Sequence, residues 1–140
     1  MIFMKLVSAC LAGVKCRYDG NAKPDRKIME MVKSGKAIPV CPEQLGGLPT
    51  PRPATELING RAFTCDGRDV TIALRRGAAE ALKIAKLSGC KEAIMKARSP
   101  SCGSGEIYDG SFSGKLVKGD GITAALLKKN GIKVKTEEEI

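Results

Sequence analysis

Short apolar runs along the chain alternate with longer segments in which apolar residues recur at helical spacing. The runs predict four buried strands, at residues 2–7, 37–40, 92–96 and 132–134. The helical spacing predicts three helices, at residues 24–33, 71–88 and 121–130. This alternation is typical of a single α/β domain, here residues 1–140, with a mostly parallel, Rossmann-like sheet and helices on both faces. A site in such a fold lies at the carboxyl ends of the strands.

Two long segments follow neither pattern. Residues 46–60 are rich in glycine and proline, and residues 97–121 are rich in glycine and serine. Loops of this length are commonly functional. A further strand is predicted at residues 61–64, and the acidic tail at residues 136–140 is expected to fray.

The composition narrows the chemistry further. The 140 residues include no histidine, which excludes His-based triads, His-containing zinc sites and Cys–His nucleophile pairs. Lysine and arginine number 24 against 15 acidic residues, and the resulting net charge of +9 favours an anionic partner. An aromatic content of 4% argues against a base-stacking platform for single-stranded nucleic acid.

The opening of the chain resembles a secretion signal only superficially. Its apolar stretch is short and is followed at once by Cys10, and no apolar run reaches the roughly 18 residues of a membrane helix. We therefore expect residues 2–7 to form a strand and the protein to be cytoplasmic, with no membrane partner.

Three of the six cysteines come soon after predicted strands. Cys10, Cys41 and Cys102 follow the first, second and third strands along the chain. Because the carboxyl ends of parallel strands meet at one edge of a sheet, we expect these thiols to converge there. Cys65 and Cys90 are expected to act as small apolar residues, since disulfides are uncommon in the cytoplasm.

A thiol site without histidine favours an iron–sulfur cluster over zinc, because three-ligand zinc sites usually include histidine. A [4Fe–4S] cluster held by three cysteines would leave one iron exposed as a Lewis acid. Cys16, six residues after Cys10, is the candidate for a fourth ligand, which would close that position.

Three stretches of the chain carry a more specific signal. They read SACLAGVKCRYDG at 8–20, VCPEQLGGLPTPRPATE at 40–56 and KARSPSCGSGEIYDGSFSGKLVKGDGITAALLKKNGI at 96–132. Together they resemble the thiouracil desulfidase family (TudS-type), some relatives of which act on 4-thiouridine in RNA. The resemblance spans nearly the whole chain, and the combination of motifs is specific although no single part is.

The resemblance implies that Cys10, Cys41 and Cys102 ligate a [4Fe–4S] cluster whose fourth iron binds the sulfur of the substrate. It implies a non-redox reaction, in which water attacks the ring carbon and sulfide is left on that iron. The substrate would be a small thiolated pyrimidine or nucleotide. The basic charge favours 4-thiouridine monophosphate over thiouracil, and RNA is less favoured because the chain has no room for a further domain.

The candidate catalytic residues lie near two of these cysteines. Glu43, two residues after Cys41, is the candidate general acid or base. Ser99 and Ser101, just before Cys102, are candidates for relaying a proton or holding the ring, and each could equally cap its own loop.

Four residues are candidates for substrate binding. Arg52, between two prolines, is the first candidate for a phosphate contact, because a guanidinium offers two-pronged hydrogen bonding, and Arg17 is the second. Asp19 is either a contact to a ring edge or the turn residue of an Asp–Gly pair. Ser8, in the small-residue segment before Cys10, is the fourth.

Three other functions stay open. A non-catalytic module that carries or senses iron would use Cys16 as a fourth ligand and would release no sulfide. A cofactor-free thiol enzyme would use Cys102 as its nucleophile. An RNA-binding module would need no cluster, and its binding would weaken steeply with salt.

Overall fold

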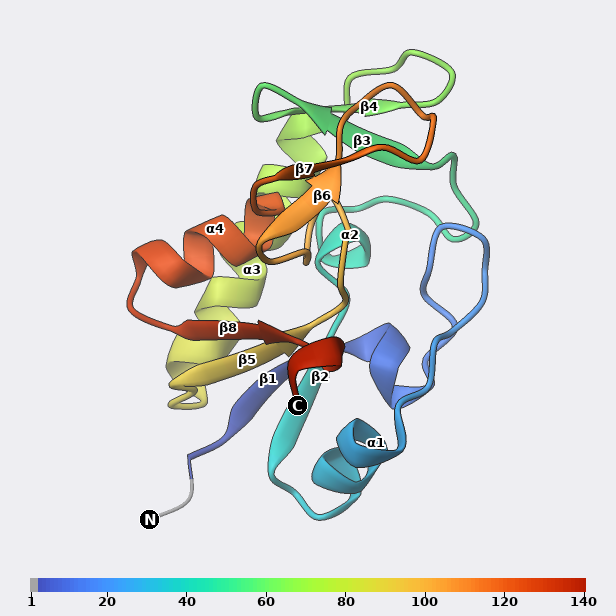
Figure 1. The fold of residues 1–140 in the computed structure, drawn as a ribbon. Helices are drawn as coiled ribbons and strands as arrows, with labels where there is room; N and C mark the ends of the chain where they lie inside the picture. The colour runs from blue at the N-terminus through green and yellow to red at the C-terminus, as the bar shows by residue number, and fades with distance from the viewer. Residues whose placement is uncertain (1–2) are drawn as a thin grey trace.

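The computed structural model describes residues 3–140 and is built on a sheet of four parallel strands in the order β2-β1-β5-β8 (Figure 1). The strands are β1 (Lys5–Ser8), β2 (Ala37–Val40), β5 (Glu92–Met95) and β8 (Lys133–Thr136). All four predicted strands are therefore present, displaced by a few residues at most. Ile2, part of the predicted first strand, lies outside the described residues.

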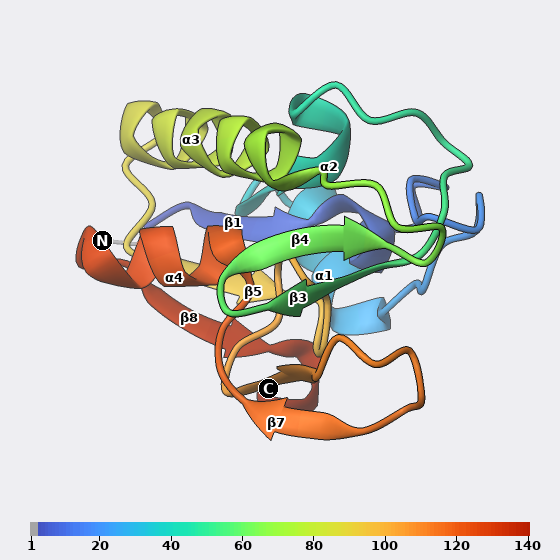
Figure 2. The same ribbon diagram turned by 90° about the horizontal axis from the view of Figure 1, so that it is seen from above.

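Helices cover both faces of this sheet, which confirms the predicted fold class. On one face lie α3 (Thr71–Leu87) and α4 (Ile122–Lys129), and on the other lie α1 (Arg26–Lys33) and the 3₁₀ helix η1 (Ala9–Ala12) (Figures 1 and 2). Within residues 3–140, no helix has the length and apolar character needed to cross a membrane.

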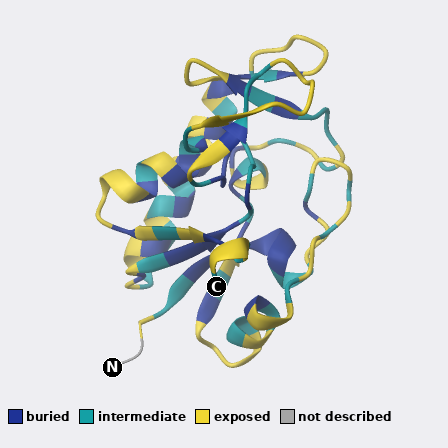
Figure 3. Ribbon diagram, in the orientation of Figure 1, coloured by how far each residue is buried: buried dark blue, intermediate teal, exposed yellow. Residues whose placement is uncertain are grey.

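The central strands alternate their side chains between two apolar cores. Leu6 and Met95 pack in the core beneath α3 and α4. Val7 and Ile94 point the other way and pack with Ile28 of α1. The middle of the sheet is therefore buried on both sides (Figure 3), as continuous apolar strands of a parallel sheet should be.

Two antiparallel hairpins stand beyond the carboxyl edge of the sheet (Figure 1). Their strands are β3 (Thr55–Ile58) paired with β4 (Arg61–Thr64), and β6 (Glu106–Tyr108) paired with β7 (Leu116–Lys118). Only β4 was predicted, so the interpretation of the two long segments as loops without strands is wrong in part. Their glycines and prolines form the connections between short strands.

The acidic tail is ordered, and the expectation that it frays is wrong. It forms the 3₁₀ helix η2 (Glu137–Glu139), which begins with a capping box between Thr136 and Glu139. Glu137 also accepts a hydrogen bond from the backbone N–H of Ala97 at 2.7 Å. The tail therefore supports the segment that follows β5.

The short helix α2 (Pro42–Leu45), which begins directly after Cys41, packs against α3 through two glycines. A Cβ atom added at Gly77 of α3 would lie 1.8 Å from the carbonyl oxygen of Pro42. A Cβ atom added at Gly46 would lie 2.0 Å from a carbonyl oxygen of α3. Only glycine allows the two backbones to approach so closely, and this contact fixes where α2 starts.

We expect Gly77→Ala to destabilise the protein. In a helix with free space around it, the change would stabilise the protein by up to about 1 kcal/mol through helix propensity. Here the new methyl group would overpack against the backbone of α2, which cannot move away as a side chain can, and overpacking costs about 1–3 kcal/mol. Chemical denaturation should therefore show a net loss, of about 2 kcal/mol where the overpacking cost is at the upper end of its range. The control is Ala79→Gly, at an exposed position of the same helix, which should lose only the propensity of about 1 kcal/mol. A Gly77→Ala variant as stable as the parent would refute the constraint.

Candidate active site

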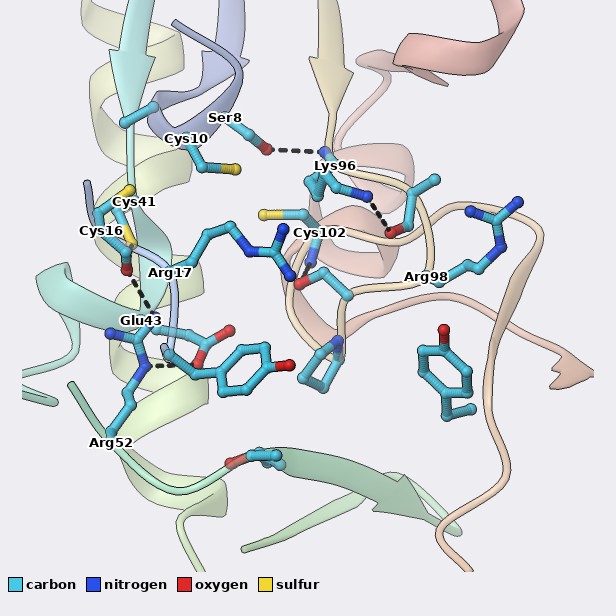
Figure 4. A pocket seen from close by; sticks show the side chains of 18 of the residues that line it. Ser8, Cys10, Cys16, Arg17, Cys41, Glu43, Arg52, Lys96, Arg98 and Cys102 are labelled. Carbon is cyan, nitrogen blue, oxygen red and sulfur yellow. Dashed lines mark hydrogen bonds and ion pairs between the residues drawn. The ribbon is translucent and has the colours of Figure 1, made fainter. Parts of the chain in front are cut away.

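A cavity of about 430 Å³ opens at the carboxyl edge of the sheet (Figure 4). Its wall comes from the segments that follow β1, β2 and β5, and the two hairpins contribute residues at its outer side. This is the place where a parallel α/β sheet is expected to bind a ligand.

Four of the six cysteines line this cavity: Cys10, Cys16, Cys41 and Cys102. Cys65 is exposed away from it. Cys90 is buried in the core beneath α3 and α4. The structure thus brings together the three thiols that follow predicted strands, with Cys16 beside them. Their role as ligands stays a prediction.

Each of the three thiols is held by a different local structure. Cys10 lies in η1, which continues directly from β1. Cys41 is the N-cap residue of α2, and its thiol donates to the carbonyl oxygen of Cys16 at 3.7 Å. Cys102 follows a turn in which the Ser99 hydroxyl accepts a hydrogen bond from the Cys102 backbone N–H at 3.0 Å.

Burial and mutual contact keep the thiols of Cys16, Cys41 and Cys102 protonated. Burial raises the pKa of Cys102 to about 12, although hydrogen bonds from Ser8 and Ser99 act in the opposite direction. A hydrogen bond with Cys10 raises the pKa of Cys16 to about 11. The pKa of Cys41 is raised as well, by its contact with Cys16 and by burial. Without a metal, the thiols of Cys16, Cys41 and Cys102 are therefore neutral.

The donor set fits a multi-iron cluster better than a single ion. Among residues 3–140, no three Cys, Asp or Glu side chains lie close enough to share one metal ion. A cluster needs thiols that are spread around a larger space, and the four cysteines that line this cavity offer soft sulfur donors in that arrangement.

Glu43 lies in the first turn of α2 and faces the cavity, where its side chain is 13% exposed. Arg52 reaches it from the following loop and donates from Nε to Glu43 Oε1 at 3.0 Å. The Arg52 side chain is 5% exposed and also donates to the carbonyl oxygen of Cys16 at 2.9 Å. Arg52 therefore ties Glu43 to the loop that carries Cys16.

The serines differ in how they face the cavity. Ser99 lines it, while Ser101 is fully buried behind the loop and shares a hydrogen bond of 2.8 Å with the Thr123 hydroxyl of α4. Ser8 also lines the cavity and accepts from the backbone N–H of Lys96 at 2.8 Å. The surroundings of Ser101 are those of a structural residue, whereas Ser8 and Ser99 are near the thiol of Cys102.

Asp19 does not line the cavity, unlike Arg17. The Asp19 carboxylate accepts from the backbone N–H of Asn21 at 3.0 Å, and this hydrogen bond is the main cause that lowers its pKa. This geometry is that of an Asx turn, which orders the loop carrying Arg17.

Sequence reasoning missed two basic residues that line the cavity, Lys96 and Arg98. Lys96 forms an ion pair with Glu137 at 3.1 Å, and Arg98 forms one with Glu138 at 2.8 Å. The signal that could have found them is their position at and just beyond the carboxyl end of the strand predicted at residues 92–96, at the same edge as the cysteines. Arg98 also has a left-handed backbone, with φ of 65°, which is uncommon outside glycine.

The chain is similar to members of one family along almost its whole length. Residues 6–139 match the model of a family described as 2-thiouracil desulfurase. The uncharacterized protein YbbK of Bacillus subtilis (strain 168) is 46% identical over 147 residues, which cover 98% of this chain and 97% of that protein. A solved structure, the [4Fe-4S]-dependent thiouracil desulfidase TudS, is 43% identical and matches with a TM-score of 0.94 over 99% of this chain and 93% of that one.

We expect Ser101→Ala to reduce stability, because the buried Thr123 hydroxyl would lose its partner at a cost of about 1–3 kcal/mol. Thr123→Val should cost a similar amount, and the double variant should lose less than the sum of the two. Urea denaturation of the parent, the two single variants and the double variant measures these losses, with Ser113→Ala at an exposed position as control. Unchanged stability with lost turnover in Ser101→Ala would instead support a catalytic role.

Proposed function

The chain belongs to the 2-thiouracil desulfurase family, and on this premise we propose that it is a [4Fe–4S]-dependent desulfidase of thiolated uracil compounds. Membership of the family confirms the resemblance carried by the motifs. The observation that carries the proposal is the grouping of Cys10, Cys41 and Cys102 around one cavity that also contains Glu43.

Cys10, Cys41 and Cys102 would hold the cluster through their thiolates. When bound, a [4Fe–4S] cluster with three protein ligands supplies one open, Lewis-acidic iron that can take up the sulfur of a thiocarbonyl and polarise the C=S bond. Ser8 and Ser99 would donate hydrogen bonds toward the sulfur of Cys102, as their effect on the pKa of this thiol indicates. Such hydrogen bonds tune cluster thiolates.

The reaction replaces sulfur by oxygen without a change of redox state. Water adds to the ring carbon, the C–S bond breaks, and the products are the uracil carbonyl and hydrogen sulfide. Glu43 would take a proton from the attacking water, since its carboxylate faces the cavity and Arg52 holds it in place. Ser99 would hold the ring or relay a proton, whereas the burial of Ser101 leaves it outside this proposal.

The substrate that we favour is a small thiolated nucleotide, 4-thiouridine monophosphate, ahead of free thiouracil. The reason is the net charge of +9, which favours an anionic ligand. RNA is a less favoured partner.

A second candidate function is an iron carrier or sensor, and the position of Cys16 favours it. Cys16 is 2% exposed, lines the same cavity and is in hydrogen-bond contact with Cys10 and Cys41. A fourth thiolate from Cys16 would close the open iron position. Substrate-dependent release of sulfide distinguishes the two functions, because only the enzyme shows it.

A cofactor-free thiol enzyme is disfavoured by the environment of Cys102. A nucleophilic thiol needs a lowered pKa. Burial instead raises the pKa of Cys102 to about 12.

The experiment that tests the proposal is anaerobic reconstitution, followed by measurement of iron, acid-labile sulfide and the visible absorption spectrum. About four iron and four sulfide per chain are expected for a [4Fe–4S] cluster. The reconstituted protein should then release sulfide from 2-thiouracil and from 4-thiouridine monophosphate. A protein that retains no iron would reject the proposal.

Replacement of Cys10, Cys41 or Cys102 by Ala should abolish cluster assembly, because each removes one of three thiolates. Iron content and the absorption spectrum after reconstitution measure this. The matched controls are Cys65→Ala and Cys90→Ala, at one exposed and one buried cysteine outside the cavity, and both should load normally. Normal iron content in Cys41→Ala would overturn the ligand assignment.

Glu43→Gln should keep the cluster and lose turnover. Glutamine can still accept the hydrogen bond from Arg52, but it cannot take a proton, and loss of general base catalysis typically costs about 10²–10⁴-fold in rate. Sulfide release per cluster measures the effect, with the exposed Glu30→Gln of α1 as control. Turnover at the parental rate would exclude Glu43 as the acid or base.

A further inference from the structure

Four basic side chains line the cavity, and carboxylates neutralise three of them. Lys96 is paired with Glu137, and Arg98 is paired with Glu138 and, at 3.5 Å, with Glu106. The third, Arg52, is paired with Glu43. A positive charge that is already balanced within the protein attracts an anionic ligand weakly.

Arg52 also lacks free donors. Besides Glu43, it donates from Nη1 to the Pro49 carbonyl oxygen at 3.1 Å and to the Thr50 hydroxyl at 3.0 Å, and from Nη2 to the Cys16 carbonyl oxygen. A guanidinium has five N–H groups, so these hydrogen bonds leave little capacity for a phosphate. Arg52 is therefore a structural part of the cavity wall.

Arg17, the fourth cation, has the opposite surroundings. Its Nη1 is buried and has no hydrogen-bond partner, and across residues 3–140 it is the one buried side-chain nitrogen or oxygen in this condition. Its ion pair with Asp19 is long, at 4.0 Å from Nε to Oδ1, and the same carboxylate oxygen accepts from the backbone N–H of Asn21. The guanidinium carbon lies 5.6 Å from the centre of the Tyr18 ring, and the side chain extends into the cavity in Figure 4.

We propose that Arg17 recognises the phosphate of a nucleotide substrate, and this inference rests on the proposed desulfidase function. A buried guanidinium nitrogen without an acceptor is costly, and an anionic oxygen from the ligand removes that cost through a charge-assisted hydrogen bond. A phosphomonoester balances a full positive charge, which a neutral ring carbonyl does not. This proposal reverses the order that the sequence suggested, in which Arg52 was the first candidate for the phosphate contact and Arg17 the second.

The position of Arg17 in the chain agrees with this assignment. It follows the buried Cys16 and precedes Tyr18 and Asp19, both exposed, so its backbone passes from the thiols to the outside of the cavity. Cys10, Cys41 and Cys102 lie in the segments that follow the strands, on the side of the sheet. A nucleotide would place its ring toward the cysteines and its phosphate toward Arg17.

The test compares the binding of UMP and uridine, which contain no thiocarbonyl and are not turned over, by anaerobic titration calorimetry with the reconstituted protein. The parent should bind UMP more tightly than uridine. Arg17→Gln should weaken UMP binding by about 10- to 100-fold and leave uridine binding unchanged. Arg17→Lys, which keeps the charge, should retain part of the preference, and the control Arg75→Gln, at an exposed position of α3 outside the cavity, should retain it in full.

Several outcomes would overturn the assignment to Arg17. These are a parent that does not prefer UMP, an Arg17→Gln variant that keeps the preference, and equal weakening of UMP and uridine, which would place the contact at the base. Loss of iron from Arg17→Gln with the preference intact would show that the charge serves the cluster. Sulfide release from 2-thiouracil, which has no phosphate, tests the proposed function separately, so the two failures are distinguishable.

Discussion

The four strands of the central sheet all run in one direction, and the grouping of the cysteines depends on this constraint. β1 pairs in parallel with both β2 and β5, so the segments that leave these strands emerge at one edge. Cys10, Cys41 and Cys102 belong to those segments and are separated by tens of residues in the chain. Were β2 antiparallel to β1, Cys41 would lie at the opposite edge from Cys10. Strand direction therefore brings these thiols together, as closely spaced sequence positions bring together the ligands of a zinc finger.

A shared edge brings the thiols near one another, but packing against the helices fixes their positions. α2 is set on α3 by the glycine contact at Gly46 and Gly77. The loop of Cys102 is held by the start of α4, where the backbone N–H of Thr123 donates to Ser101 at 2.8 Å. These supports lie in the core, away from the cavity. The walls of the site are thus held by rigid elements, which is the arrangement that an ordered cluster or a precisely placed substrate requires.

The sequence predicted the parallel sheet and the convergence of three thiols because both follow from patterns local to each element. It missed the hairpins and the ordered tail, since these depend on partners far along the chain, such as Glu137 with Ala97. It also ranked Arg52 above Arg17 as a phosphate contact. The motif shows that Arg52 lies in a stiff loop, but only the fold shows that Glu43 and two carbonyl oxygens already occupy it. Pairing of charges is a property of tertiary structure.

The Glu43–Arg52 pair and the raised pKa values of three thiols limit the negative charge of the cavity, and this has a chemical consequence. The thiols of Cys16, Cys41 and Cys102 are protonated because burial and mutual contact raise their pKa values, and Glu43 is balanced by Arg52. A bound metal must therefore displace protons from the cysteines, and the negative charge of the thiolates then exists only together with the iron. Since a neutral thiol is a poor nucleophile, the protein by itself is a weak reagent toward a thiocarbonyl. In the mechanism that we propose, the side chains would position the substrate, the cluster would polarise the C=S bond and Glu43 would move the proton, so catalysis would need no histidine.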